Sequence, residues 1–358
     1  MKRKSLLIAS LLLLQFFKVE AQGIWQGEGT PPFNYDFGSG TGNSGNTYNA
    51  TGTSKSSVST STTAGFLAYP TSGYARVYTG ASSSGGFAVN SSPVSVTLTA
   101  SNSTSAPNKL SLYNIQGLSA VTSTFFKMSF DNTTASTGAI TYAFGNSAST
   151  TEGNNIFNNG AILQGGSFPG IFNYLRWDMT ATTITFSYRG TDGAAITINS
   201  STFSKNGGDY DVEVYANNHA NAHDYVRGIT TYTLPSGTFN IWVNGARITG
   251  ASSLINFPRT GELALGQELN SLLVQGVRST SGALATARFG NFDIKFIPTS
   301  TLPVSFVDFT ATKNTNSAFL KWQTSSEKDN DYFEVLRKTD NSKGFESIAK
   351  VSSKVTAG

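Results

Sequence analysis

The stretch that decides the fold is Thr238-Phe239-Asn240-Ile241-Trp242-Val243-Asn244-Gly245-Ala246-Arg247. Its first six residues are mainly β-branched and aromatic, and this composition is typical of a β-strand. Asn244-Gly245 then separates this run from a second short run, and Asn-Gly in that position is the strongest short-range signal of a hairpin. The stretch therefore predicts two antiparallel strands joined by a tight turn.

The same pattern of short β-branched and aromatic runs between turn residues recurs from Phe66 onward. Strict alternation in Val94–Leu98 and Ile184–Tyr188 indicates strands with one buried and one solvated face, as antiparallel sheets have. The other expected strands are Ala75–Thr79, Gly86–Val89, Val94–Ala100, Lys109–Ile115, Phe125–Asp131, Ala139–Phe144, Leu175–Met179, Thr183–Tyr188, Ala195–Ile198, Tyr210–Tyr215, Tyr232–Leu234, Leu263–Leu265, Ala287–Phe289 and Asp293–Phe296. Many short strands without a long helix predict an all-β, antiparallel β-sandwich.

The first 21 residues have the composition of a secretory signal peptide. Lys2-Arg3-Lys4 forms a basic start, residues 5–17 carry no charge, and Val19-Glu20-Ala21 offers a cleavage site before Gln22. The uncharged run is shorter than the roughly 20 residues that a membrane-spanning helix needs. We therefore expect a cleaved signal peptide over residues 1–21, no membrane-spanning segment afterwards, and a secreted or outer-cell-surface location.

The charge of the chain does not indicate a nucleic-acid partner. The formal net charge of +4 arises from 25 basic and 21 acidic residues, and four of the basic ones lie in the signal peptide. The rest is nearly balanced and shows no basic stripe, the usual footprint of a nucleic-acid binder. The chain has no cysteine, so a secreted form must be stabilised by its core or by bound ions.

Three segments of the larger part of the chain share features with a known family: Tyr210–Tyr215, Thr238–Arg247 and a last strand, Phe289–Ile297. They resemble the concanavalin-like, laminin-G-like jelly roll, in which a Val/Trp-rich strand runs into an Asp/Asn-Gly turn. The resemblance implies a β-sandwich domain over residues 66–298. A Gly/Ser/Thr-rich arm and loop, residues 22–65, is expected before it.

The end of the chain carries a second resemblance, in Leu302-Pro303-Val304-Ser305-Phe306, Ala318-Phe319-Leu320-Lys321-Trp322 and Asn330-Asp331-Tyr332-Phe333-Glu334-Val335. These residues resemble the fibronectin-III-like module that precedes the C-terminal sorting domain of proteins exported by type IX secretion in Bacteroidetes. The resemblance implies a linker over residues 299–303 and a module over residues 304–358, with Trp322 in its core. Such a module has about seven strands, and only four are expected here. We therefore expect a partial module and a chain that is a fragment of a longer protein.

Three acidic residues alternate along one expected strand. Asp209, Asp211 and Glu213 share a face, while Tyr210 and Val212 point to the other. The row resembles the Glu-x-Asp-x-Glu strand of concanavalin-like endoglucanases, whose first carboxylate is the nucleophile and whose last is the acid/base. This chain departs from that pattern because Asp209 stands in the nucleophile position.

The geometry of a strand favours a solvated face over catalysis for this row. Retaining hydrolysis needs carboxyl groups about 5–5.5 Å apart, whereas residues i and i+4 of a strand start about 13 Å apart. Two alternatives remain: a β-glucanase site using Asp209, Asp211 and Glu213, and a structural Ca²⁺ site formed by these residues and loop carbonyls.

His219 and His223 are the only histidines, and Asp224 follows them. Their i, i+4 spacing could hold zinc on a helix, but Ala220 replaces the Glu of His-Glu-x-x-His, and the segment lies between strands. We expect surface-loop histidines. Three tryptophans are expected in the core: Trp25, Trp177 and Trp242.

Together these features predict an exported cell-surface or extracellular protein that binds carbohydrate or acts in adhesion, without catalysis and without a cofactor apart from a structural Ca²⁺. The expected partner is a polysaccharide or a cell-surface glycan. The fold supports this function only by analogy. A glycoside hydrolase of the β-glucanase type and a structural surface component without a ligand are the alternatives.

Overall fold

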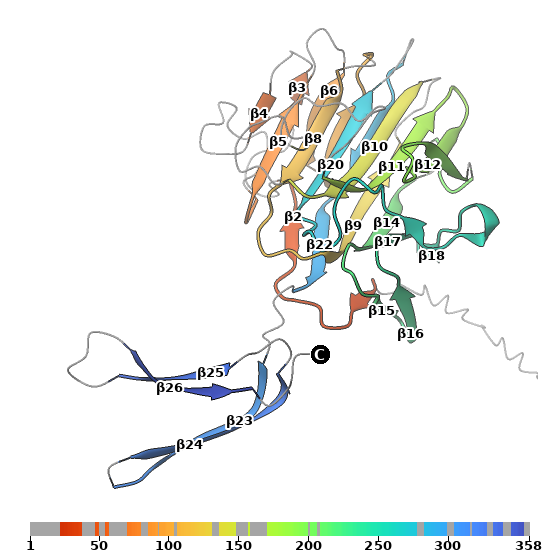
Figure 1. Ribbon diagram of the computed structural model, residues 1–358. Coiled ribbons are helices and arrows are strands. Elements are labelled where there is room, and N and C mark those ends of the chain that lie inside the picture. The colour runs from red at the N-terminus through yellow and green to blue at the C-terminus, as the bar shows by residue number, and fades with distance from the viewer. Residues whose placement is uncertain are drawn as a thin grey trace, which may run out of the picture. The chain divides into compact units, whose positions relative to one another are not determined.

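The computed structural model (Figure 1) describes residues 22–37, 47–49, 54–56, 70–79, 85–91, 93–103, 106–130, 136–147, 157, 170–199, 201–205, 208–277, 283–298, 304–315, 317–327, 332–338 and 345–353. The chain divides into two compact units, Met1–Ile297 and Pro298–Gly358, called here the body and the tail. The expected signal peptide and linker lie outside the described residues, as does most of residues 38–65 of the expected Gly/Ser/Thr-rich arm and loop.

The body contains two large antiparallel sheets. The eight-stranded sheet runs, in spatial order, β13 (Ala195–Asn199), β12 (Ile184–Arg189), β11 (Ile171–Met179), β10 (Gly138–Gly145), β20 (Ser271–Val277), β8 (Asn108–Tyr113), β5 (Tyr74–Tyr78) and β4 (Ser54–Ser56). The eleven-stranded sheet runs, in spatial order, β18 (Ala246–Arg247), β17 (Thr238–Val243), β14 (Tyr210–Asn217), β9 (Val121–Ser129), β21 (Thr286–Phe289), β7 (Val94–Thr99), β6 (Gly86–Ser91) and β3 (Thr47–Asn49). Its three remaining strands lie off this path. Strand β22 (Phe292–Ile297) pairs with β9, β2 (Phe33–Tyr35) pairs with β22, and β19 (Phe257–Pro258) pairs with β17. Every strand pair among the described residues is antiparallel, so the predicted β-sandwich class is confirmed.

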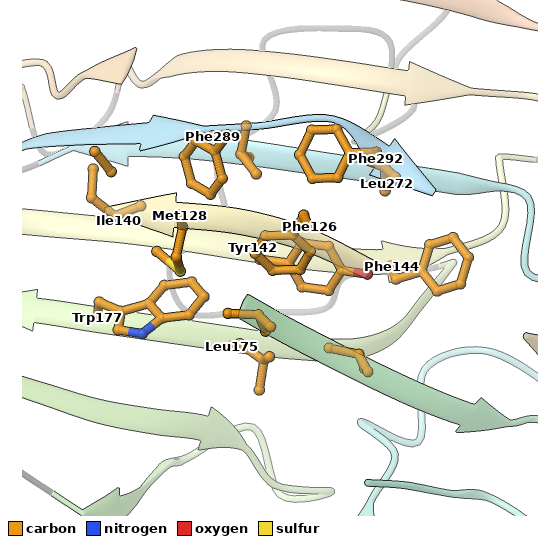
Figure 2. Packing of buried hydrophobic residues seen from close by; sticks show 14 of the residues in the cluster. Phe126, Met128, Ile140, Tyr142, Phe144, Leu175, Trp177, Leu272, Phe289 and Phe292 are labelled. Carbon is orange, nitrogen blue, oxygen red and sulfur yellow. The ribbon is translucent and has the colours of Figure 1, made fainter. Parts of the chain in front are cut away.

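The core lies between these two sheets and is rich in aromatic rings. Figure 2 shows Phe126 of β9 beside Tyr142 of β10, and their ring centroids are 5.1 Å apart. Trp177 of β11 stacks on Phe186 of β12 at 5.3 Å. Burial of such large apolar surfaces is the main stabilising term of the fold. The predicted inward side chains of β14 are also buried: Tyr210, Val212 and Val214.

The predicted hairpin at Asn244-Gly245 is confirmed. Val243 and Ala246 are paired across it, and both turn residues have positive φ, 49° and 78°. Positive φ at both central positions defines the turn that matches the right-handed twist of a hairpin. Asn244 also ties the turn to β14, because its Oδ1 accepts a hydrogen bond from the Asp211 N–H at 2.7 Å.

Most of the expected strands are present, but Leu263–Leu265 is not a strand. This segment lies between Gly261 and Gly266, whose φ angles of 84° and 83° mark turns at both ends. The strands that were not expected include β15 (His223–Arg227) and β20, and also the short β2, β3, β4 and β19. The single helical element among the described residues is a 3-10 turn, Ala251–Ser253, and no helix in this part of the chain is long and apolar enough to span a bilayer.

Residues 22–37, expected to belong to an arm or loop, contribute to two sheets. Strand β1 (Ile24–Trp25) pairs with β15, and β15 pairs with β16 (Thr230–Leu234) in a small third sheet. Figure 1 shows β1, in red, beside the green β15 and β16. Strand β2 pairs with β22. Four aromatic residues of this segment are buried, because they pack under these strands: Trp25, Phe33, Tyr35 and Phe37.

The tail consists of two hairpins, β23 (Val304–Lys313) with β24 (Ala318–Glu327) and β25 (Tyr332–Arg337) with β26 (Glu346–Ser352). These strands confirm the four expected there. Trp322 of β24 lies 5.5 Å from Phe333 of β25, centroid to centroid, so the two hairpins touch through aromatic rings. Several large apolar side chains of the tail are exposed, among them Phe309, Phe319, Phe345 and Ile348.

Candidate functional site

The outer face of the eleven-stranded sheet carries an open groove of about 1460 Å³. Strands β9, β14, β21 and β22 line it, together with residues of β1 and β15. All three acidic residues of the predicted row lie in this groove. The interaction that each carboxylate makes decides what the groove can do.

Asp209 and Asp211 are solvated, as the strand-face interpretation predicted. Lys127 lies directly opposite Asp211 in the register of β9 and β14, and its Nζ contacts Asp211 Oδ1 at 2.6 Å. Arg288 of β21 reaches Asp209 Oδ1 through Nη2 at 2.7 Å. The Asp209 and Asp211 side chains keep 50% and 63% of their surface exposed, so each pair remains open to a ligand.

Glu213 departs from that interpretation, because it is buried. Arg227 of β15 donates to both of its carboxylate oxygens, Nη2 to Oε1 at 2.6 Å and Nε to Oε2 at 3.2 Å. Tyr215 Oη donates to Oε2 as well, at 2.6 Å. The Arg227 guanidinium also lies over the Trp242 ring, 4.3 Å from its centroid. Glu213 therefore joins the small sheet to β14 through a buried, charge-assisted contact.

The N-terminal strand closes this buried cluster. The Gly23 N–H donates to Tyr215 Oη at 2.7 Å, and Trp25 packs edge-on against Tyr215 and Tyr225 at 5.8 and 5.4 Å. Burial, with the Glu213 charge beside it, raises the pKa of Tyr215 far above its usual value. Burial likewise raises the pKa of Tyr225 to about 12. Both hydroxyls are therefore protonated at neutral pH and can donate hydrogen bonds.

A polar network holds the hairpin of β15 and β16 on the sheet. Tyr225 Oη donates to Asn240 Oδ1 at 2.8 Å and accepts from Trp242 Nε1 at 3.1 Å. Arg247 Nη2 donates to the same Asn240 oxygen at 2.8 Å and to Asn256 Oδ1 at 3.0 Å. The predicted core position of Trp242 is confirmed, and Trp25 and Trp177 are buried too. The β15–β16 hairpin, which forms this side of the groove, is therefore packed against β17.

His219 and His223 meet outside the groove. His219 lies in the connection from β14 to β15, whereas His223 is the first residue of β15 and thus not in a loop. His223 Nε2 lies 3.1 Å from His219 Nδ1, and that nitrogen also accepts from the Asn221 N–H at 3.2 Å. In the part of the chain that the structure describes, no group of three or more His, Asp or Glu residues is arranged to hold a metal ion.

A buried cation lies on the eight-stranded sheet, away from the groove. Lys109 of β8 is opposite Gln275 of β20 and Tyr78 of β5. It is 1% exposed, and burial together with the nearby charge of Arg76 lowers its pKa to about 7. Because Lys109 loses its proton at a lower pH in the folded protein than in the unfolded chain, the stability of the protein should depend on pH.

The carboxylates of the groove accept hydrogen bonds from neighbouring side chains. Both Glu213 oxygens accept hydrogen bonds from Arg227, and one accepts a further bond from Tyr215. Asp209, in the nucleophile position of the resemblance, is held by Arg288. The three carboxylates therefore act as hydrogen-bond acceptors on the groove floor and in its wall.

The sequence predicted the acidic residues of the groove that precede or lie on β14 but not the basic residues that pair with them. Lys127, Arg227 and Arg288 come from three strands, and none carries a motif in the sequence. The one available signal was the antiparallel pairing itself, which places Lys127 opposite Asp211 once β9 is known to neighbour β14.

No protein-family model and no curated relative matches the chain. Among solved structures, a sialidase is similar at 11% identity over 65% of this chain, with a TM-score of 0.35, and the chain spans 18% of its length. A legume lectin-like domain from Entamoeba histolytica is similar at 12% identity over 59% of this chain and 86% of its own, with a TM-score of 0.36. The family 7 alginate lyase A1-II′ is similar at 11% identity over 58% and 82%, with a TM-score of 0.32.

Proposed function

We propose that this protein binds carbohydrate through the groove on its eleven-stranded sheet and does not cleave it. The observation that supports this function is the pairing of an exposed carboxylate with an exposed cation at Asp211 and Lys127, and again at Asp209 and Arg288. A sugar hydroxyl both donates and accepts hydrogen bonds. Each pair offers an acceptor and a donor within 3 Å of one another, on strands that fix their positions.

The rigidity of the groove also favours binding. Its floor is the middle of a large sheet, and its wall is held by the buried Glu213–Arg227 contact. A ligand that meets a preformed site avoids the entropy of ordering loops and side chains. Binding and positioning groups on strands are also more precisely placed than those on loops.

The test is binding of the full chain to a glycan array, with measurement of reducing-sugar release from β-glucans and agar in parallel. The double variant Lys127→Ala/Asp211→Ala should lose at least tenfold in affinity, because it removes one donor–acceptor pair from the floor. The matched control is Arg176→Ala/Asp178→Ala. It removes an ion pair from the eight-stranded sheet, whose Arg176 Nε lies 2.9 Å from Asp178 Oδ1.

The outcomes separate the alternatives. Binding that the groove variant weakens and the control does not would support the proposal. Sugar release that Glu213→Gln abolishes, in a variant whose melting temperature shows that it is folded, would show a hydrolase instead. An array without any bound glycan would favour a structural surface component.

We also propose that the protein works outside the cell or on its outer surface, by type IX secretion. The proposal is supported by the leader-like composition of residues 1–21 and the resemblance of the tail to a fibronectin-III-like module. N-terminal sequencing of protein from the culture medium and the cell surface tests it. A start at Gln22 would support export with cleavage, and protein found only inside the cell, with Met1 retained, would contradict it.

A further inference from the structure

The groove is electrically balanced, and each of its basic side chains has an acidic partner. Four basic side chains line it, Lys127, Arg227, Arg288 and Lys295, and so do four acidic ones, Asp209, Asp211, Glu213 and Asp293. We infer that the groove selects neutral, hydroxyl-rich glycans and rejects glycans that carry carboxylate or sulfate groups. This inference rests on the proposed carbohydrate-binding function and specifies its ligand class.

The cations of the groove are already engaged by acidic side chains. Lys127 contacts Asp211, Arg288 contacts Asp209, and Arg227 contacts Glu213, all at 2.6 to 2.7 Å. Lys295 Nζ lies 3.9 Å from Glu28 Oε1. To bind one of these cations, an acidic sugar would have to compete with a protein carboxylate that is already held in place by the backbone of the sheet. The incoming anion therefore gains little from these cations.

The exposed charges on the groove floor include carboxylates that repel an anion. Asp211 is exposed to the same degree as Lys127, 63% against 62% of the side chain. Asp209 is more exposed than its partner Arg288, 50% against 28%. An anionic ligand lying along β14 would thus approach two exposed carboxylates. Like charges brought together in this way disfavour the wrong partner.

Hydroxyl groups suit a groove floor of paired charges. Lys127 has three N–H donors and uses one on Asp211, whose oxygens keep further lone pairs. A hydroxyl can donate to the carboxylate and accept from the ammonium at once, and it leaves the ion pair intact. A neutral glycan therefore gains hydrogen bonds without breaking the pairs.

Among the described residues that line the groove, the aromatic rings are buried. The two phenylalanines of the groove, Phe125 and Phe126, are buried, with 2% and 4% of their surface exposed. Neither offers an open ring face to a sugar. Recognition in the groove thus depends on hydroxyl hydrogen bonds and not on a ring platform, which is consistent with selection by charge.

The experiment compares the full chain with Asp209→Asn/Asp211→Asn on an array that holds matched neutral and uronate-containing oligosaccharides. The double variant leaves Lys127 and Arg288 without their carboxylates. It should therefore gain at least tenfold in affinity for the uronate probes, and added salt should weaken this new binding. The single variant Asp211→Asn should show a smaller gain. Asp178→Asn, which frees Arg176 on the other sheet, is the matched control and should gain nothing.

The results distinguish this inference from the proposed function. Wild-type protein that binds neutral probes only, with the expected gain in the double variant, supports both. Wild-type binding to uronate probes that Lys127→Ala abolishes, or no gain in a folded double variant, would overturn the selection by charge and leave carbohydrate binding intact. Wild-type protein that binds neither class of probe would overturn the proposed function and this inference with it. Melting temperatures of all variants show that each is folded.

Discussion

Glu213 and Arg227 meet in a two-point contact in which each oxygen of the carboxylate accepts a hydrogen bond from the guanidinium. Both side chains are almost fully covered, with 7% and 3% of their surface exposed. The contact joins β14 of the eleven-stranded sheet to β15 of the small sheet. It differs from the other two ion pairs along β14, which are open to solvent.

The first prediction compares the buried pair with an exposed one. Glu213→Gln should lower the free energy of unfolding by about 3–5 kcal/mol, because it leaves the Arg227 charge buried without its partner. Asp211→Asn breaks the exposed pair with Lys127 and should cost no more than about 1 kcal/mol. Chemical denaturation of the three proteins measures both values. Equal effects of the two substitutions would mean that burial does not set the strength of these pairs.

The second prediction concerns the place of Gly23 under Tyr215. A Cβ at this position would lie 2.4 Å from Tyr215 Oη, so Gly23→Ala must displace the ring or the N-terminal strand. We expect a loss of about 1–3 kcal/mol, the usual cost of overpacking, and faster hydrogen exchange at the Trp25 amide. Gln22→Ala is the control, because Gln22 is exposed. Unchanged stability in Gly23→Ala would show that β1 is not held as described.

The third prediction follows from the lowered pKa of Lys109, about 7 in the folded protein against 10.5 ordinarily. Between these values the unfolded chain keeps a proton that the folded protein has lost. The unfolded state then binds more protons, so the free energy of unfolding should rise with pH from about 7 to about 9, by at most about 1.4 kcal/mol per unit. The stability cost of the buried charge is fully present below pH 7.

Lys109→Met should remove this rise, whereas Lys127→Met, at an exposed site, should keep it. Denaturation curves at several pH values measure the slope. The window stops near pH 9 because tyrosines of the unfolded chain begin to titrate near 10, and the raised pKa values of Tyr142 and Tyr215 then lower stability. A wild-type slope of zero would mean that Lys109 keeps its proton.

The fourth prediction is that Ca²⁺ will not raise the melting temperature. A bound cation stabilises the folded state in proportion to the logarithm of its concentration over its Kd. Asp209, Asp211 and Glu213, the residues expected to form a Ca²⁺ site if one exists, each contact a basic side chain. Melting curves in Ca²⁺ and in a chelator should therefore coincide. A rise that Asp211→Asn removes would establish a calcium site.

The fifth prediction concerns the tail, whose hairpins expose Phe309, Phe319, Phe345 and Ile348. A unit with few buried apolar contacts opens at low cost. Limited proteolysis should cut within the tail, or just before it, and leave a resistant body that ends near Pro298. Mass spectrometry of the fragments checks this. Equal resistance of body and tail would show that the hairpins are protected in another way.

The sequence predicted the class of fold because alternation marks any strand with one wet face, as in β7. The prediction of strands failed where the two faces of a strand do not differ in exposure to solvent, or where the local composition is misleading. Strand β20 is buried along its whole length, so Ser271–Val277 shows no alternation. Strand β15 follows an Asn/Ala-rich segment that reads as a loop. Leu263–Leu265 has the composition of a strand, but the glycines that flank it turn the chain.

The site was predicted in part for the same reason. Alternation correctly placed Asp209, Asp211 and Glu213 on one face of β14, opposite Tyr210. It could not show that Gly23, 192 residues earlier, contacts Tyr215, the side chain that donates a hydrogen bond to Glu213. Burial of a polar side chain by a distant strand is a tertiary effect, and local pattern carries no signal of it.

The pairing of β2 with β22 and of β1 with β15 has a consequence for how the body is made. Strand β2, which contains Phe33, can pair only after residues near Ile294 have been synthesised. By that point almost the whole body has been made. Contacts of such high sequence separation slow folding, because a long loop must close before they form. The eleven-stranded sheet therefore reaches its full set of strands only after β22 has left the ribosome, and until then β2 lacks its partner in that sheet.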